Sequence, residues 1–264
     1  MLLLLSGCGG GSDSNTVNNA NASAGNNAAN SGSATVLRAY NNQPDGQKQI
    51  DCANAYKTNE SCDLSEIRPL GADKYFYNVT LNDIRDRIVT THDWMGDSLI
   101  AALQQIDNQD LLNLFKPVNA IVISYDTRPA FYHPLTGSIY LDPRYLWRDL
   151  SEWNTIEKKD DYRQDFGRPL QFATPMRYIN PSDNSRLEVS NTLSTSNPFR
   201  TTEELAPRLF ALLVHELAHA NDFLPPDRLM TLLYFGDFDE AISLFPELYI
   251  NQQLKSVTHS IQKH

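Results

Sequence analysis

ALLVHELAHAND, residues 211–222, is the stretch that constrains the fold of this chain most strongly. The apolar residues in and before it recur at the spacing of one helix face, and the Thr-x-x-Glu pattern of residues 201–204 is typical of a helix start. His215 and His219 are four residues apart, so a helix places both imidazoles on one face. We therefore expect a largely buried helix ending near Asn221. Pro207 either marks its first turn or kinks it.

The two histidines have the spacing of a zinc site. Zinc binds imidazole nitrogens at about 2.0–2.1 Å, and a catalytic zinc keeps three protein ligands and one water. Glu216 follows His215 directly, and its carboxylate can take a proton from that water, whose pKa zinc lowers to about 7. The His-Glu-x-x-His pattern thus predicts Zn²⁺ as cofactor, His215 and His219 as ligands and Glu216 as catalytic base. The alternative is a pair of surface histidines with Glu216 in solvent.

HELAHA, residues 215–220, resembles the active-site helix of the zincin metallopeptidases. The metzincin branch has Gly and His at the positions of Asp222 and Pro225, so this branch is disfavoured. The thermolysin-like gluzincin branch takes its third ligand from the Glu of an Asn-Glu-Ala-Ile-Ser segment on a later helix. Residues 239–243 read DEAIS, and Glu240 stands 21 residues after His219. The resemblance implies that Glu240 is the third zinc ligand.

Two alternatives to this ligand set remain open. Asp222, one turn beyond His219, is a rival third ligand or an acceptor for a ligand imidazole. Glu240 can instead be the capping-box partner of Asp237. The chain also departs from the family at Leu244, where an Asp often orients a zinc-binding histidine.

The resemblance implies an α+β, zincin-like fold: a small sheet packed on the active-site helix, further helices C-terminal to it, and an edge strand that binds the substrate backbone. The β-branched run of residues 118–125 predicts a strand, and so does SIYL at 138–141; both are candidates for that edge. Apolar spacing predicts helical structure over 81–115, and shorter helices over 227–234 and 238–244.

Residues 1–8, MLLLLSGC, resemble a bacterial lipobox, in which the chain is cut before Cys8 and the thiol is lipidated. Residues 9–36 are mostly Gly, Ser, Asn and Ala, a composition that predicts a disordered tether with a reach of about 30 Å. The catalytic domain then spans 37–264. Gly9 rather than Asp favours the outer membrane, so we expect an envelope lipoprotein that faces the periplasm or the exterior. A chance apolar start with a free cysteine is the alternative.

The remaining cysteines, Cys52 and Cys62, are expected to form a disulfide, because exported proteins keep such bonds. A metal site at this pair would lack further cysteine ligands. The net charge of -10 argues against a nucleic-acid partner, which would require an excess of Lys and Arg.

The predicted function is therefore zinc-dependent hydrolysis of a peptide or protein substrate by a lipid-anchored envelope protein. The alternative is an inactive zincin-like lipoprotein that acts in binding or in envelope assembly. It is motivated by the missing histidine-orienting Asp and by the lack of an identifiable oxyanion donor.

Overall fold

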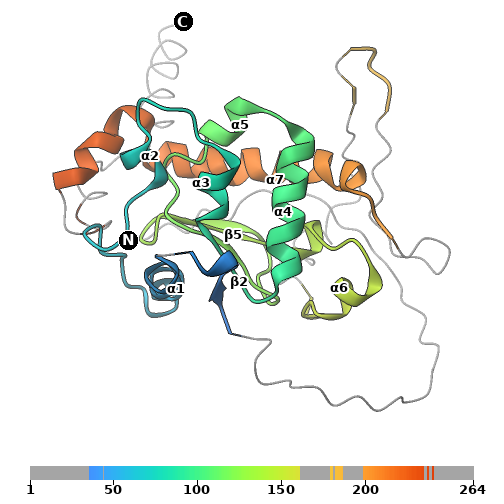
Figure 1. The fold of residues 1–264 in the computed structure, drawn as a ribbon, viewed down its shortest axis with the longest axis horizontal. Helices are drawn as coiled ribbons and strands as arrows, with labels where there is room; N and C mark the ends of the chain where they lie inside the picture. The colour runs from blue at the N-terminus through green and yellow to red at the C-terminus, as the bar shows by residue number, and fades with distance from the viewer. Residues whose placement is uncertain are drawn as a thin grey trace, which may run out of the picture.

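The computed structural model describes residues 36–43, 45–160, 179–180, 182–186, 199–234, 237 and 240. These residues form a mixed α+β fold with a five-stranded sheet and helices on both sheet faces (Figure 1). The predicted lipobox, the predicted tether except for residue 36, and most of the predicted helix at 238–244 lie outside the described residues.

The sheet has the strand order β1-β2-β3-β5-β4. The three central strands, β2, β3 and β5, run parallel to one another, whereas β1 and β4 pair antiparallel at the two edges. The bounds are Arg38–Ala39 for β1, Ile88–Thr90 for β2, Ile121–Ile123 for β3, Phe131–His133 for β4 and Ser138–Leu141 for β5.

Both predicted strands are confirmed, but their predicted place at the sheet edge is wrong. β3 pairs with β2 on one side and β5 on the other, and β5 pairs with β3 and β4. Every residue of β3 and β5 is buried, as expected for parallel strands covered on both faces. The edge strand on this side is β4, a three-residue strand that the sequence pattern did not single out.

The α-helices lie between and after these strands. Their bounds are Gly46–Ala55 for α1, Leu70–Asp73 for α2, Leu81–Arg85 for α3, Asp93–Ile106 for α4, Gln109–Asn113 for α5, Leu150–Asn154 for α6 and Thr202–Phe223 for α7. Four 3₁₀ segments complete the described elements: η1 at Tyr40–Asn42, η2 at Tyr56–Thr58, η3 at Pro143–Tyr145 and η4 at Pro226–Tyr234. The helical prediction over 81–115 is wrong at β2, where the β-branched residues of Ile88–Thr90 form a central strand.

The hydrophobic core covers both faces of the sheet, with a separate cluster on each face. Ile121, Ile123, Ile139 and Leu141 point to the side covered by α4 and α7. Figure 1 shows α4 crossing α7 on this side. The opposite face packs against α1 through Ala53, Val122 and Tyr140.

Tyr40 packs against the N-terminal part of α4 through both its hydroxyl group and its ring. Its hydroxyl donates to Asp97 at 2.5 Å, and its ring covers Gly96, where an added Cβ would lie 2.6 Å from Tyr40 Cδ2. We expect Gly96→Ala to destabilise the fold by about 1–3 kcal/mol through overpacking, more than the roughly 1 kcal/mol that alanine gains in a helix. Urea denaturation measures the change, with Gln104→Ala on the exposed side of α4 as the control. A stabilised Gly96→Ala variant would contradict this packing.

Cys52, in α1, and Cys62 form a disulfide, as predicted. The sulfurs lie in a small apolar cluster with Leu224 and Leu229, which follow the end of α7. Asp63, next to Cys62, forms an antiparallel β-bridge with Asp237. The disulfide-bonded loop therefore supports the segment that leaves α7.

We expect the double variant Cys52→Ala and Cys62→Ala to lose about 2–3 kcal/mol of unfolding free energy, because a disulfide limits the entropy of the unfolded chain. Denaturation with and without a reductant measures this loss. The reductant should destabilise the native chain to a similar extent and leave the double variant unchanged. If the native chain and the double variant were equally stable without reductant, the disulfide would have no stabilising role.

Candidate metal centre

The helix that carries the histidine pair begins where the sequence predicts. The Thr201 N–H donates to Glu204 Oε2 at 2.8 Å, and the Glu204 N–H donates to Thr201 Oγ1 at 3.3 Å. This capping box satisfies N–H groups that the first turn of a helix leaves unpaired. Pro207 lies inside α7, five residues after its first residue, so it does not mark the first turn.

One face of α7 is packed into the core and holds the helix in place. Leu209, Leu213, Leu217 and Ala220 are fully buried in the main cluster, and the helix contacts α4, β4 and β5. Near the end of α7, Asn221 Nδ2 donates to the carbonyl of Leu114 at 2.9 Å. The side chains on the rest of α7 therefore project from a fixed support.

His215 and His219 meet on this support. Their Nε2 atoms are 3.3 Å apart, their ring centroids are 4.9 Å apart, and the ring planes are nearly perpendicular at 88°. Two nitrogens bound tetrahedrally at about 2.0–2.1 Å from one zinc would lie about 3.3–3.4 Å apart. The spacing of the two nitrogens fits a shared zinc ion.

The protonation state of His219 also suits metal binding. Burial lowers the pKa of His219, the positive charge of a protonated His215 lowers it further, and the charge of Asp222 acts in the opposite direction. A lowered pKa leaves the imidazole neutral at pH 7, and the neutral ring is the form that binds metals.

Glu216 occupies a different environment from its neighbours on α7. Its side chain is only 4% exposed, whereas His215 is exposed to solvent. A buried carboxylate requires polar or charged partners, and Glu216 has an interaction of this kind in the structure. Glu216 is thus buried beside the first histidine. The alternative that places Glu216 in solvent is wrong on this point.

The structure does not assemble a third ligand at the histidine pair. Among the described residues, no three His, Cys, Asp or Glu side chains are grouped so that they could hold a metal. Glu240 is exposed, and its N–H donates to Asp237 Oδ1 at 2.7 Å, as the capping alternative predicts. Asp222 is half-buried. The assignment of either residue as third ligand stays a prediction.

Sequence reasoning missed a basic residue on the same helix face. Arg208 stands seven residues before His215, two turns away, and its guanidinium lies over the Tyr145 ring at 5.2 Å from the centroid. The seven-residue spacing between Arg208 and His215 could have revealed that both lie on one helix face. The contact between Arg208 and Tyr145 could not be predicted, because η3 lies far from α7 in the sequence.

Comparisons of the chain with protein-family models, with curated proteins and with solved structures give no match. Among the described residues, no helix combines the length and the apolar character needed to cross a bilayer.

Proposed function

We propose that this chain is a zinc-dependent peptidase of the zincin type, in which His215 and His219 hold the metal and Glu216 is the general base. The observation that carries the proposal is the 3.3 Å separation of the two Nε2 atoms on a helix packed into the core. A hydrogen bond between the two imidazoles would give a similar separation, so zinc content is the measurement that decides between the two.

The bound zinc would supply Lewis acidity and a water activated for attack on a carbonyl. Glu216 is adjacent to the ligand His215 on a rigid helix, so it can accept a proton and pass it to the leaving amine. The low exposure of Glu216 limits its motion and the access of bulk water. Glu240, from the segment after α7, is the proposed third ligand, and Asp222 is its rival.

The substrate in this proposal is an extended peptide that pairs with the free edge of β4. Within the described residues β4 pairs only with β5, and the other side of Phe131–His133 is the edge that we propose for strand addition. α7 contacts β4, and the Tyr132 ring lies 5.8 Å from the Phe223 ring. A peptide on this edge would run close to the helix that carries the histidines. Lipidation at Cys8 would hold the enzyme at the cell envelope.

Metal removal and replacement test the proposal directly. Protein purified without chelators should contain about one zinc per chain and should hydrolyse a mixed panel of unstructured peptides. Dialysis against a chelator should abolish hydrolysis, and added zinc should restore it. Metal analysis and chromatography of the peptide products are the measurements.

The outcome of the same experiment separates the proposal from its alternative. Zinc without hydrolysis of any peptide would favour an inactive protein that uses the site for binding. Hydrolysis that survives complete removal of zinc would rule out the proposed mechanism.

A further inference from the structure

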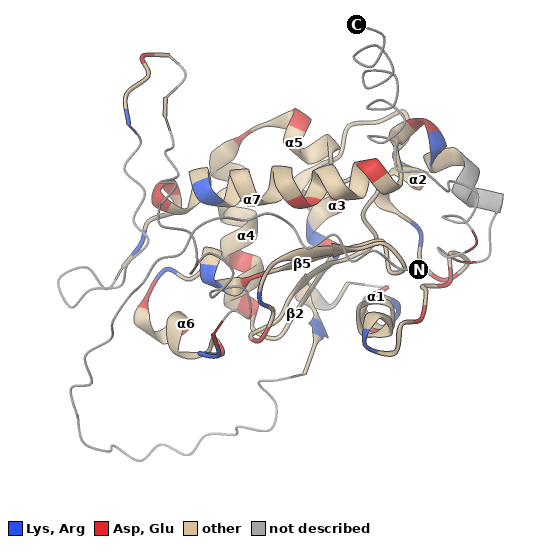
Figure 2. Ribbon diagram, turned by 180° about the vertical axis from the view of Figure 1, so that it is seen from behind, with Lys and Arg blue, Asp and Glu red and all other residues tan. Residues whose placement is uncertain are grey.

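Arg208 carries a positive charge that the described structure does not neutralise. It is the one basic residue of α7, visible in Figure 2 as the single blue segment of that helix. In the part of the chain that the structure describes, no Asp or Glu forms an ion pair with it. Glu204, one turn earlier, instead binds the Thr201 N–H with its carboxylate. Among the described residues no carboxylate occupies the guanidinium donors of Arg208, and we take an external anion as their partner.

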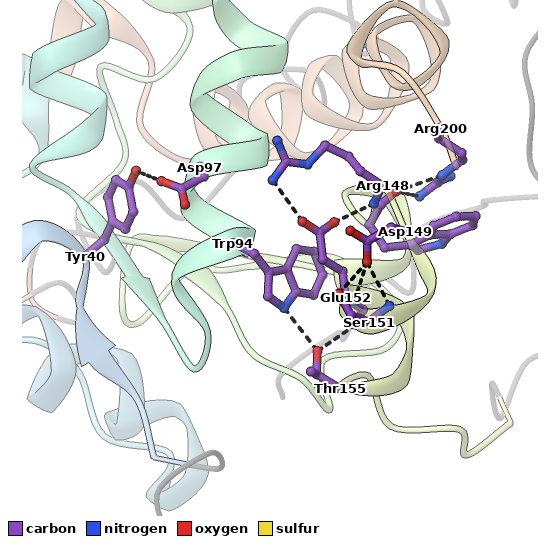
Figure 3. A network of polar contacts seen from close by, with 10 residues as sticks. Tyr40, Trp94, Asp97, Arg148, Asp149, Ser151, Glu152, Thr155 and Arg200 are labelled. Carbon is purple, nitrogen blue, oxygen red and sulfur yellow. Dashed lines mark hydrogen bonds and ion pairs between the residues drawn. The ribbon is translucent and has the colours of Figure 1, made fainter. Parts of the chain in front are cut away.

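Arg200, just before α7, binds the segment that carries the Tyr145 ring beneath Arg208. The guanidinium of Arg200 lies 3.4 Å from the centroid of the Trp147 ring. Its Nε donates to the Trp147 carbonyl at 2.8 Å, and its Nη2 donates to the Arg144 carbonyl at 3.1 Å. Figure 3 shows Arg200 in a network of polar contacts that includes Arg148 and Glu152. Because Tyr145 lies between Arg144 and Trp147, these bonds hold the backbone that carries its ring in place relative to Arg200, two residues before α7 begins.

The charge of Arg208 is felt at Arg200, where the carboxylates of Glu204 and Glu152 act in the opposite direction. Burial lowers the pKa of Arg200, and the next largest cause of this lowering is the charge of Arg208. The chain as a whole has a net charge of -10. A guanidinium with free donors above an aromatic ring is well suited to bidentate binding of a carboxylate.

The position of Arg208 determines which carboxylate it can reach. Seven residues of α-helix place its Cα about 10 Å from that of His215 along the axis. An extended peptide advances about 3.3 Å per residue. A carboxylate bound by Arg208 would therefore lie about three residues from the bond at the metal.

We propose that Arg208 is a specificity-determining residue that binds a substrate carboxylate about three residues from the cleaved bond. The carboxylate is either an acidic side chain or the free C-terminus of the peptide. This inference rests on the proposed peptidase function, since it places the cleaved bond at the histidine pair.

Peptide binding to zinc-loaded protein carrying Glu216→Gln tests the inference without turnover. One series compares a free C-terminal carboxylate with its amide, and a second moves a single Glu along an amidated peptide, with Gln at the same position as control. We expect about tenfold tighter binding for carboxylates at the favoured position, as a charge-assisted pair provides. The series that shows the effect identifies the source of the carboxylate.

Arg208→Ala should remove this preference and leave zinc content unchanged, while Arg208→Lys should restore part of it. Arg38→Ala is the control, because it removes the same charge from β1, the opposite edge strand, where Arg38 forms an exposed ion pair with Asp93 of α4. In the active enzyme, Arg208→Ala should raise KM for carboxylate peptides and leave kcat nearly unchanged.

Each outcome supports or overturns the inference. If Arg208→Ala weakens the binding of carboxylate and amide peptides equally, or if the position of the carboxylate does not affect binding, Arg208 does not bind the substrate carboxylate. Active enzyme without a carboxylate preference would overturn this inference and leave the peptidase proposal intact. If the protein prefers carboxylate peptides through Arg208 but cleaves none of them, the binding role of Arg208 stands and the peptidase proposal is overturned.

Discussion

Glu216→Gln is expected to reduce peptide hydrolysis by about a thousandfold, within the range that loss of a general base produces. Glutamine has nearly the shape of glutamate, so it fits the buried site, which is only 4% exposed. Its amide cannot accept the proton that the carboxylate takes. Steady-state kinetics on one peptide measure the loss, and metal analysis should still give about one zinc per chain.

Glu203→Gln provides the matched control for this variant. Glu203 lies on the same helix, is exposed, and undergoes the same chemical change. Its activity should equal that of the native protein. Full activity of Glu216→Gln would show that another group is the base, whereas loss of zinc along with activity would show that Glu216 supports the metal site rather than the proton transfer.

The second large effect is expected at the histidines themselves. His215→Ala and His219→Ala should each weaken zinc binding by more than the roughly 10–100-fold that removal of an outer-shell partner costs. Each removes one of the two nitrogens that lie 3.3 Å apart. Competition with a chelator of known affinity measures the change.

These histidine variants should fold normally, which makes the result interpretable. His215 is exposed and His219 is only partly buried, so neither belongs to the packed core. His92→Ala is the control: this histidine lies directly before α4, on an element other than α7, and its Nδ1 contacts Thr91 Oγ1 at 3.0 Å. Zinc affinity unchanged in all three variants would place the metal elsewhere or exclude it.

The features that local sequence encodes were predictable. The start of α7, the pairing of the two histidines and the strands β3 and β5 each depend on residues within one helix or one short run. The disulfide was predictable because the lipobox resemblance implies an exported protein, in which two cysteines at a sequence separation of 10 are expected to pair. Helix α1 was missed because its buried face includes Gly46 and Gln49, which give no apolar period.

Features that depend on distant segments could not be predicted in this way. Gln49 is buried because its side chain donates to the carbonyl of Asp86, 37 residues away. The order of the strands, which makes β4 rather than β3 the edge, follows from the packing of the whole sheet. The third ligand has the same character: among the described residues none is grouped with the histidine pair, and the proposed ligand Glu240 lies on the chain after α7, whose path local sequence does not encode.

That path has a consequence for how the protein should be produced. The polypeptide that leaves α7 returns to the loop closed by Cys52 and Cys62, where Asp237 pairs with Asp63. A reducing host cytoplasm would keep both sulfurs as thiols. Recombinant material made there would lack the covalent link beneath this returning segment, so secretion into an oxidising compartment is the appropriate route before any assay.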